Sequence, residues 1–174
     1  MSKMKILIIN VTRIGDTLFS VPSIRAIAQH YQGAEITVLA HPNRYEVLEH
    51  LPYVQHVGGI TKKSAWYRGW LGKQYDLAFV YGSDAPLVRY AARVSRKVVG
   101  YRHEDAAIDA LIDTKVEPPP FKSDHVVRQM LELPKAVGIT TQNLRIDLSL
   151  TDAERTWARE KLSHAGIKPE NLLI

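Results

Sequence analysis

The chain has 174 residues, 45% of them hydrophobic and 24% charged, which is enough for one domain with its own core. It has no cysteine, which excludes disulfides, a thiolate nucleophile and cysteine-based zinc sites. The formal charge of +5 suits an anionic partner such as phosphate, nucleic acid or an acidic membrane surface, although many proteins carry such a charge without a specific role.

The first predicted elements are a strand, a polar turn and a helix. The apolar run at 6–9 is typical of a strand buried on both faces of a parallel sheet, and it is too short for a signal-peptide core or a membrane span. Apolar residues at steps of three and four over 18–31 line one helix face, and Pro22 predicts a kink in that helix. Ligands of open α/β sheets bind beyond the carboxyl ends of strands, so the turn at 11–17 is the first candidate site.

The rest of the chain alternates strands with helices. Strands are predicted at 34–40, 54–57, 75–81 and 97–101, and helices at 44–50, 63–73, 85–95, 125–137 and 153–165. Asn43, Asp124 and Thr151 are the predicted N-caps of three of these helices. The alternation predicts a doubly wound, mostly parallel α/β sheet.

Two stretches interrupt this pattern. Residues 102–123 show little periodicity and include consecutive prolines, which predicts a long connection with one helical turn near 106–112. The chain ends on an apolar run after a polar turn, as the earlier strands begin. We therefore predict one domain over 1–168 and the start of a second, absent domain at 169–174.

The turn after the first strand contains Gly15 and Asp16 but no known nucleotide motif. The G-x-G-x-x-G fingerprint and the P-loop pattern are both absent. Asp16 then has two interpretations. It is an N-cap that binds free N–H groups of the helix, or it is a general base that takes a proton from a sugar hydroxyl.

The segment at 62–70 mixes basic and aromatic residues. Aromatic rings over sugars and cations beside phosphates would suit a phosphorylated glycolipid, and RNA-binding proteins use the same mixture. A third interpretation is a basic amphipathic helix whose Trp66 and Trp70 pack into the core. A separate set, Arg89, Arg93 and Arg96, is predicted to form a solvated helix face.

Several stretches, taken in order, resemble one known family. They lie at residues 5–9, 14–27, 34–39, 75–80, 98–102, 125–127 and 137–139. This series, with its Gly-Asp turn and following proline, resembles the N-terminal domain of the lipopolysaccharide heptosyltransferases, glycosyltransferase family 9. The stretch at 81–86 departs from the family pattern, which leaves the identities of acceptor and donor open.

The resemblance implies the N-terminal half of a GT-B enzyme, in which two Rossmann-like domains face each other across a cleft. This half would bind an anionic glycolipid acceptor of the lipopolysaccharide core. The missing half would bind a nucleotide sugar, typically ADP-heptose. No metal, other cofactor or nucleic-acid partner is implied. The expected location is the cytoplasm of a Gram-negative bacterium, and the resemblance allows peripheral contact with the inner membrane.

The resemblance also implies roles for particular residues. Asp16 matches the family's turn aspartate, the general base of an inverting transfer. Arg13 is either a solvated arginine or makes a bidentate contact with a carboxylate or phosphate of the acceptor, and Arg102 is a second candidate anion contact. The predicted acceptor contacts are Thr12, Arg13, Thr17, Lys62, Lys63, Arg68 and Arg102. His125 matches a structural position of the family, and no catalytic role is predicted for it.

A binding protein is the alternative to an enzyme. A stand-alone α/β module for a nucleotide, nucleic acid or protein partner would need no second domain. A receiver-like module would need a cluster of acids at the strand ends, and Asp16 with Asp84 does not match that pattern. If the second domain exists, this half alone should lack transferase activity, because the leaving nucleotide has no site.

Overall fold

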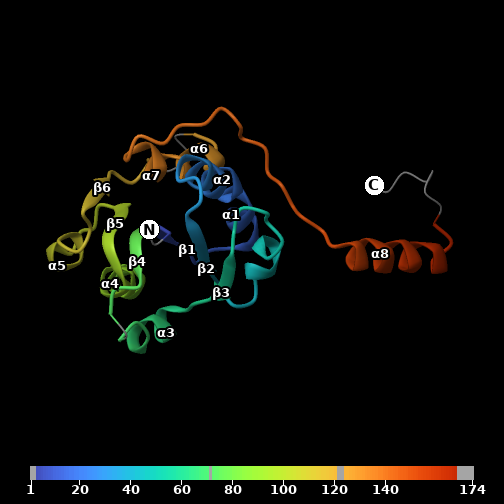
Figure 1. The fold of residues 1–174 in the computed structure, drawn as a ribbon, viewed down its shortest axis with the longest axis horizontal. Coiled ribbons are helices and arrows are strands. Elements are labelled where there is room, and N and C mark those ends of the chain that lie inside the picture. Colours follow the sequence, from blue (N-terminus) through green and yellow to red (C-terminus); the bar gives the residue numbers. More distant parts are fainter. Residues whose placement is uncertain (1–2, 71, 121–123, 168–174) are drawn as a thin grey trace.

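A six-stranded parallel sheet forms the centre of the computed structural model, which describes residues 3–70, 72–120 and 124–167 (Figure 1). The strands are β1 Lys5–Asn10, β2 Glu35–Ala40, β3 His56–Gly59, β4 Tyr75–Tyr81, β5 Ser95–Tyr101 and β6 Thr114–Val116. Their order across the sheet is β3-β2-β1-β4-β5-β6, and each neighbouring pair is parallel. The predicted doubly wound α/β class is confirmed.

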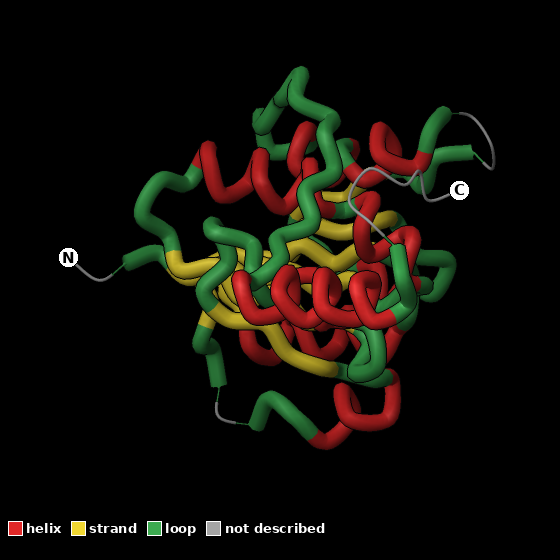
Figure 2. The backbone as a smooth tube through the Cα atoms, turned by 90° about the vertical axis from the view of Figure 1, so that its right-hand side faces the viewer, coloured by secondary structure: helices red, strands yellow, loops and turns green. Residues whose placement is uncertain are grey.

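Helices cover both faces of this sheet (Figure 2). The helices of the described chain are α1 Ile14–Phe19, α2 Val21–His30, η1 Tyr45–Leu48, α3 Lys62–Tyr67, α4 Ala85–Val94, α5 Ala106–Asp109, α6 Val126–Met130, α7 Glu132–Lys135 and α8 Asp152–His164, of which α8 does not contact the sheet. Ile6 and Ile8 of β1 pack into the core beneath α2 and α7, whereas Leu7 and Ile9 pack into the core beneath α4. Burial on both faces explains why β1 is apolar throughout instead of alternating.

The helix predicted over 18–31 is two helices. α1 ends at Phe19, and α2 restarts after Ser20, whose hydroxyl donates to the Thr17 carbonyl oxygen at 2.7 Å. Pro22 lies in the first turn of α2, where its missing N–H would have no intrahelical partner anyway. The irregularity predicted from Pro22 is confirmed.

Several predicted boundaries were wrong for local reasons. The helix expected at 44–50 is the 3₁₀ helix η1, and Arg44 occupies its N-cap position in place of Asn43. The third strand begins at His56 and includes Gly58 and Gly59, because both residues pair with β2. The helix expected at 63–73 ends at Tyr67, while residue 71 lies outside the described residues.

The connection at 102–123 contains more structure than predicted, as far as the structure describes it, to residue 120. It forms the expected turn of helix, α5, and also β6, which pairs with β5. The helix expected at 125–137 is divided into α6 and α7, with His125 in place of Asp124 at the first N-cap and Pro134 inside α7. The Thr151 capping box of α8 is confirmed.

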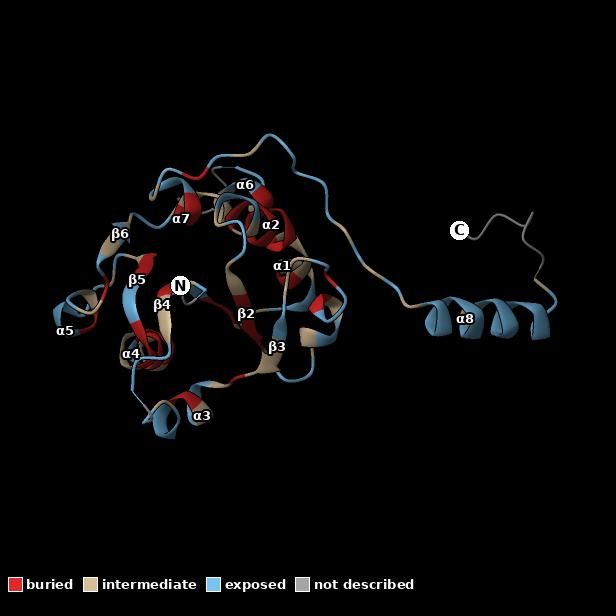
Figure 3. Cartoon of the chain, viewed as in Figure 1, coloured by how far each residue is buried: buried red, intermediate tan, exposed pale blue. Residues whose placement is uncertain are grey.

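The C-terminal helix α8 extends away from the rest of the domain and has no buried residue (Figure 3). The segment that leads to it is held by Arg25 of α2, whose side chain is only 7% exposed. Arg25 forms an ion pair with Asp147 and donates to the carbonyl oxygens of Asn143 at 2.9 Å and Arg145 at 2.8 Å. The second domain predicted to begin at 169–174 lies outside the described residues and stays a prediction.

We expect Gly69→Ala to lower the free energy of unfolding by about 1–3 kcal/mol, because it combines overpacking with backbone strain. Gly69 has φ +88, and a Cβ there would lie 2.8 Å from Cγ1 of Val94 in α4. Urea unfolding would measure the loss. Gly72→Ala is the matched control for strain alone, because Gly72 also has positive φ but has open space around its Cβ position. Equal losses in the two variants would contradict the packing argument.

Candidate functional site

The turns that follow β1 and β4 meet at the carboxyl edge of the sheet. Asn10 at the end of β1 pairs in register with Ala40 of β2 and Tyr81 of β4. From this edge β1 leads to α2 on one face, while β4 leads to α4 on the other. This reversal is the topological switch point, where open α/β sheets bind ligands.

Asp16 lies in the first turn of α1 at this switch point. Its Oδ2 accepts a hydrogen bond from Oγ1 of Thr12 at 3.0 Å, and the residue is half-buried. The N-cap position belongs to Arg13, so the N-cap interpretation of Asp16 was wrong. Its Oδ1 accepts no hydrogen bond within the described residues, which leaves one carboxylate oxygen available to a ligand.

The two threonines of the turn have different surroundings. Thr12 is half-buried, and its hydroxyl orients Asp16. Thr17 is fully buried, and its hydroxyl donates to the Arg13 carbonyl oxygen at 3.0 Å. Because this hydroxyl is buried and already bonded locally, we leave Thr17 out of the proposed acceptor contacts.

Arg13 is exposed at the N-terminus of α1. Its guanidinium has no hydrogen bond or ion pair among residues 3–70, 72–120 and 124–167. A cation with no competing anion, in the same turn as Asp16, can meet a carboxylate or phosphate of a ligand.

Sequence reasoning missed two further polar groups at this edge. Nη1 of Arg44 donates to the Thr12 carbonyl oxygen at 2.6 Å and so ties the turn after β2 to the turn after β1. Asn10 is 1% exposed, and its Nδ2 has no partner within the described residues. The only sequence signal for Asn10 was a polar residue directly after a buried apolar run.

The buried end of β4 adds a polar pair beside Asn10. The hydroxyl of Tyr81 shares a hydrogen bond with Oγ of Ser23 in α2. Burial raises the pKa of Tyr81, so its hydroxyl stays neutral at physiological pH. This contact fixes α2, and with it the turn that carries Asp16, against the end of β4.

The cations predicted in and after α3 lie elsewhere along the edge. Nζ of Lys62 forms an ion pair with Oδ1 of Asp84 at 2.5 Å, which joins the starts of α3 and α4. Nη1 of Arg68 donates to the carbonyl oxygen of Gly59 at the end of β3, at 2.9 Å. Lys63 is exposed and has no ion pair within the described part of the chain.

Arg102 is neutralised by acids of its own neighbourhood. Its Nε lies 2.6 Å from Oε1 of Glu117, and its Nη1 lies 3.9 Å from Oδ2 of Asp109. Hydrogen bonds from Lys115 and from the His103 backbone lower the pKa of Asp109. Arg102 therefore lies at the carboxyl edge, after β5, but its charge is already compensated.

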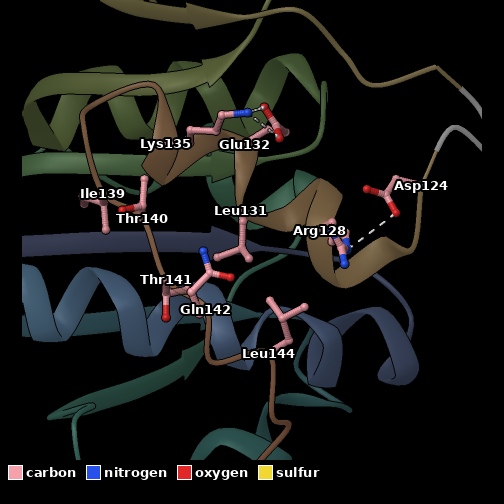
Figure 4. A pocket seen from close by; sticks show the side chains of 10 residues that line it. All are labelled: Asp124, Arg128, Leu131, Glu132, Lys135, Ile139, Thr140, Thr141, Gln142 and Leu144. Carbon is pink, nitrogen blue, oxygen red and sulfur yellow. Dashed lines mark hydrogen bonds and ion pairs between the residues drawn. The ribbon is translucent and has the colours of Figure 1, made fainter.

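The structure thus brings Thr12, Arg13 and Asp16 together and leaves the other predicted contacts spread along the edge. A surface hollow of about 370 Å³ lies between α6, α7 and residues 139–144, and none of the predicted site residues lines it (Figure 4).

Within the described residues, no group of three or more His, Asp or Glu side chains could hold a metal ion. No helix in the same part of the chain is long and apolar enough to cross a membrane.

Solved structures match the chain, whereas no protein-family model and no curated protein sequence does. A glycosyltransferase family 9 protein from Veillonella parvula DSM 2008 has a TM-score of 0.81 at 14% identity, with 97% of this chain and 51% of that one covered. The E. coli ADP-heptose lipopolysaccharide heptosyltransferase II has a TM-score of 0.68 at 19% identity, over 96% of this chain and 52% of that one. The chain has the fold of one half of a GT-B glycosyltransferase.

A third match agrees with this fold. The E. coli heptosyltransferase WaaC with ADP has a TM-score of 0.62 at 15% identity, over 83% of this chain and 51% of that one. The chain therefore spans about half the length of the solved structures that it matches. At these identities the likeness establishes the fold, and the substrates have to be argued from the site.

Proposed function

We propose that the chain is the acceptor-binding half of a glycosyltransferase that transfers a sugar, most simply heptose, from ADP-heptose to a lipopolysaccharide core acceptor. The observation that carries this proposal is Asp16 at the switch point, with one carboxylate oxygen held by Thr12 and the other without a described partner. The fold likeness supports it, since one similar protein, the E. coli heptosyltransferase WaaC, was solved both with ADP and with ADP-2-deoxy-2-fluoro heptose.

The reaction assigns one step to this half. An acceptor hydroxyl attacks the anomeric carbon of the donor, and its proton passes to the carboxylate of Asp16. The bond between the anomeric carbon and the nucleotide oxygen breaks, and its electron pair leaves with the nucleotide. Attack from the side opposite the leaving group inverts the anomeric centre. The donor site belongs to the second half, so residues 1–174 alone should not catalyse transfer.

Arg13 has the role of positioning an anionic acceptor, with Lys63 as a further cation along the edge, whereas Lys62 is already paired with Asp84. Arg13→Ala in the full-length protein is expected to raise the acceptor KM about ten-fold or more, with a smaller effect on kcat, because it removes a charged contact made before the reaction. The acceptor KM of Arg13→Lys should lie between those of the wild type and Arg13→Ala, since lysine keeps the charge but lacks the planar guanidinium that makes two parallel hydrogen bonds. Steady-state kinetics with varied acceptor would measure both.

The control for this pair is Arg145→Ala, because Arg145 is 82% exposed and lies outside the switch point. An unchanged acceptor KM in Arg13→Ala would remove Arg13 from the acceptor site.

The function itself is tested by assaying the full-length protein with ADP-heptose and truncated lipopolysaccharide acceptors. Formation of a product heavier by one heptose supports the proposal. Absence of transfer with every nucleotide sugar, together with tight binding of a nucleotide or a nucleic acid by residues 1–174, would favour the stand-alone binding module.

A further inference from the structure

Three large aromatic side chains of α3 and the turn after it face solvent. Trp66 is 76% exposed, Tyr67 61% and Trp70 79%. The interpretation that placed both tryptophans in the core was therefore wrong. Each such side chain could remove about 150–250 Å² from water, and exposed apolar groups of this size, carried by one short stretch of chain, mark an interaction surface.

The backbone that carries these aromatics is firmly attached to the domain. Ala65 is buried in the core that α4 covers. Arg93 of α4 donates to the carbonyl oxygen of Ala65 and, at 2.9 Å, to that of Arg68. This corrects the prediction that Arg93 belongs to a solvated face. Gly69 packs directly on α4, as its Cβ position 2.8 Å from Val94 shows. The aromatics are thus exposed on a packed element and not on a loose end.

The charged residues in the stretch that carries the aromatic side chains are all basic. Residues 61–74 include Lys62, Lys63, Arg68 and Lys73 and no acid. Lys62 is compensated by Asp84, and Nζ of Lys73 donates to the Ser95 carbonyl oxygen at 2.6 Å. Lys63 and Arg68 keep exposed charges in the same stretch of chain as the aromatic residues. Their partner should therefore combine negative charge with an apolar layer.

An anionic bilayer surface has both properties. Trp and Tyr favour the depth of the lipid headgroups, and Lys and Arg are attracted to anionic lipids. Helix α3 lies at the margin of the domain in both views, as an element able to meet a flat surface (Figures 1 and 2). Single-stranded RNA would instead require a groove that follows its backbone.

We propose that Trp66, Tyr67 and Trp70, with Lys63 and Arg68, form a membrane-docking surface for anionic lipid. The link to catalysis rests on the proposed function: the acceptor there is a glycolipid, and α3 begins at the carboxyl edge, where Lys62 contacts Asp84. Docking through α3 would hold that edge beside the membrane that carries the acceptor.

Vesicle binding by the 174-residue chain tests this surface without any activity assay. The chain has three tryptophans, Trp66, Trp70 and Trp157, and Trp157 is 61% exposed on α8. The Trp157→Ala variant keeps only Trp66 and Trp70, so its tryptophan fluorescence reports on the α3 surface alone. Its fluorescence should shift to the blue with vesicles of phosphatidylglycerol and phosphatidylethanolamine, but not with phosphatidylcholine alone. The double variant Trp66→Ala/Trp70→Ala keeps only Trp157, and its fluorescence should not shift when the vesicles are added.

Flotation with the same vesicles measures how strongly the protein binds, as a vesicle partition constant. Trp66→Ala/Trp70→Ala should lower the vesicle partition constant at least about ten-fold. Lys63→Gln and Arg68→Gln should each lower it about five-fold at low salt. Equal thermal midpoints of wild type and variants would show that folding is unchanged, as expected for exposed residues.

Several results would overturn the proposal: equal binding by wild type and Trp66→Ala/Trp70→Ala, equal binding to neutral and anionic vesicles, or tryptophan-dependent binding of single-stranded RNA without vesicle binding. Vesicle binding in a protein whose full-length form transfers no sugar would keep the docking surface and reject the glycosyltransferase. Transfer without vesicle binding would reject the docking surface alone.

Discussion

Replacing Asp16 with asparagine is expected to lower kcat of the full-length protein at least about 100-fold, because the variant cannot accept the proton of the attacking hydroxyl. Asparagine has nearly the same shape and keeps an oxygen that can accept the Thr12 hydroxyl, 3.0 Å from Oδ2 in the wild type. The free energy of unfolding should therefore change little. Product formation under saturating donor and acceptor would measure the loss.

Asp152→Asn is the matched control for this substitution. Asp152 is also an acid in the first turn of a helix, but it lies in α8, away from the switch point. We expect it to keep full turnover. If Asp16→Asn keeps full turnover as well, the base assignment is wrong, and Asp84, an acid in the turn after β4 at the same switch point, becomes the candidate.

Replacing Arg25 with methionine is expected to lower the free energy of unfolding of the 174-residue chain by about 2 kcal/mol. Arg25 is nearly buried and donates to one carboxylate and two backbone carbonyls of the segment at 143–147. Hydrogen bonds of a charged donor contribute about 1.5–3 kcal/mol each, offset here by the cost of burying the guanidinium. Methionine fills similar volume but leaves these acceptors without their donor.

Arg145 offers a matched comparison, because both arginines contact the same carboxylate. Nε of Arg145 lies 3.2 Å from Oδ1 of Asp147, and its side chain is 82% exposed. Such surface pairs contribute about 0–1 kcal/mol, so Arg145→Met should cost less than about 0.5 kcal/mol. Urea unfolding would compare the two variants, and limited proteolysis should cut residues 140–150 faster in Arg25→Met. Similar effects of both substitutions would contradict the role of burial.

Local sequence patterns were sufficient to predict those elements whose structure depends mainly on their own residues. β4 was predicted at 75–81 and occupies Tyr75–Tyr81, because a run of apolar residues buried on both faces has no other stable position. The Thr151 capping box was predicted because its hydrogen bonds join residues three apart. β6 was missed, because three residues with no pattern of their own form a strand only by pairing with β5.

The sequence by itself determined the fold class, because apolar periodicity is a local signal, and it placed Asp16 in a polar turn directly after a buried strand. The role of Asp16 as a base comes from the family resemblance and stays a prediction. Only the tertiary structure decided which side chains are available. Thr17 is buried and Arg102 is paired with acids, whereas Trp66 and Trp70 are exposed. Arg25 reaches Asp147, 122 residues away in the chain. Such contacts depend on how distant elements pack, and no local pattern contains that information.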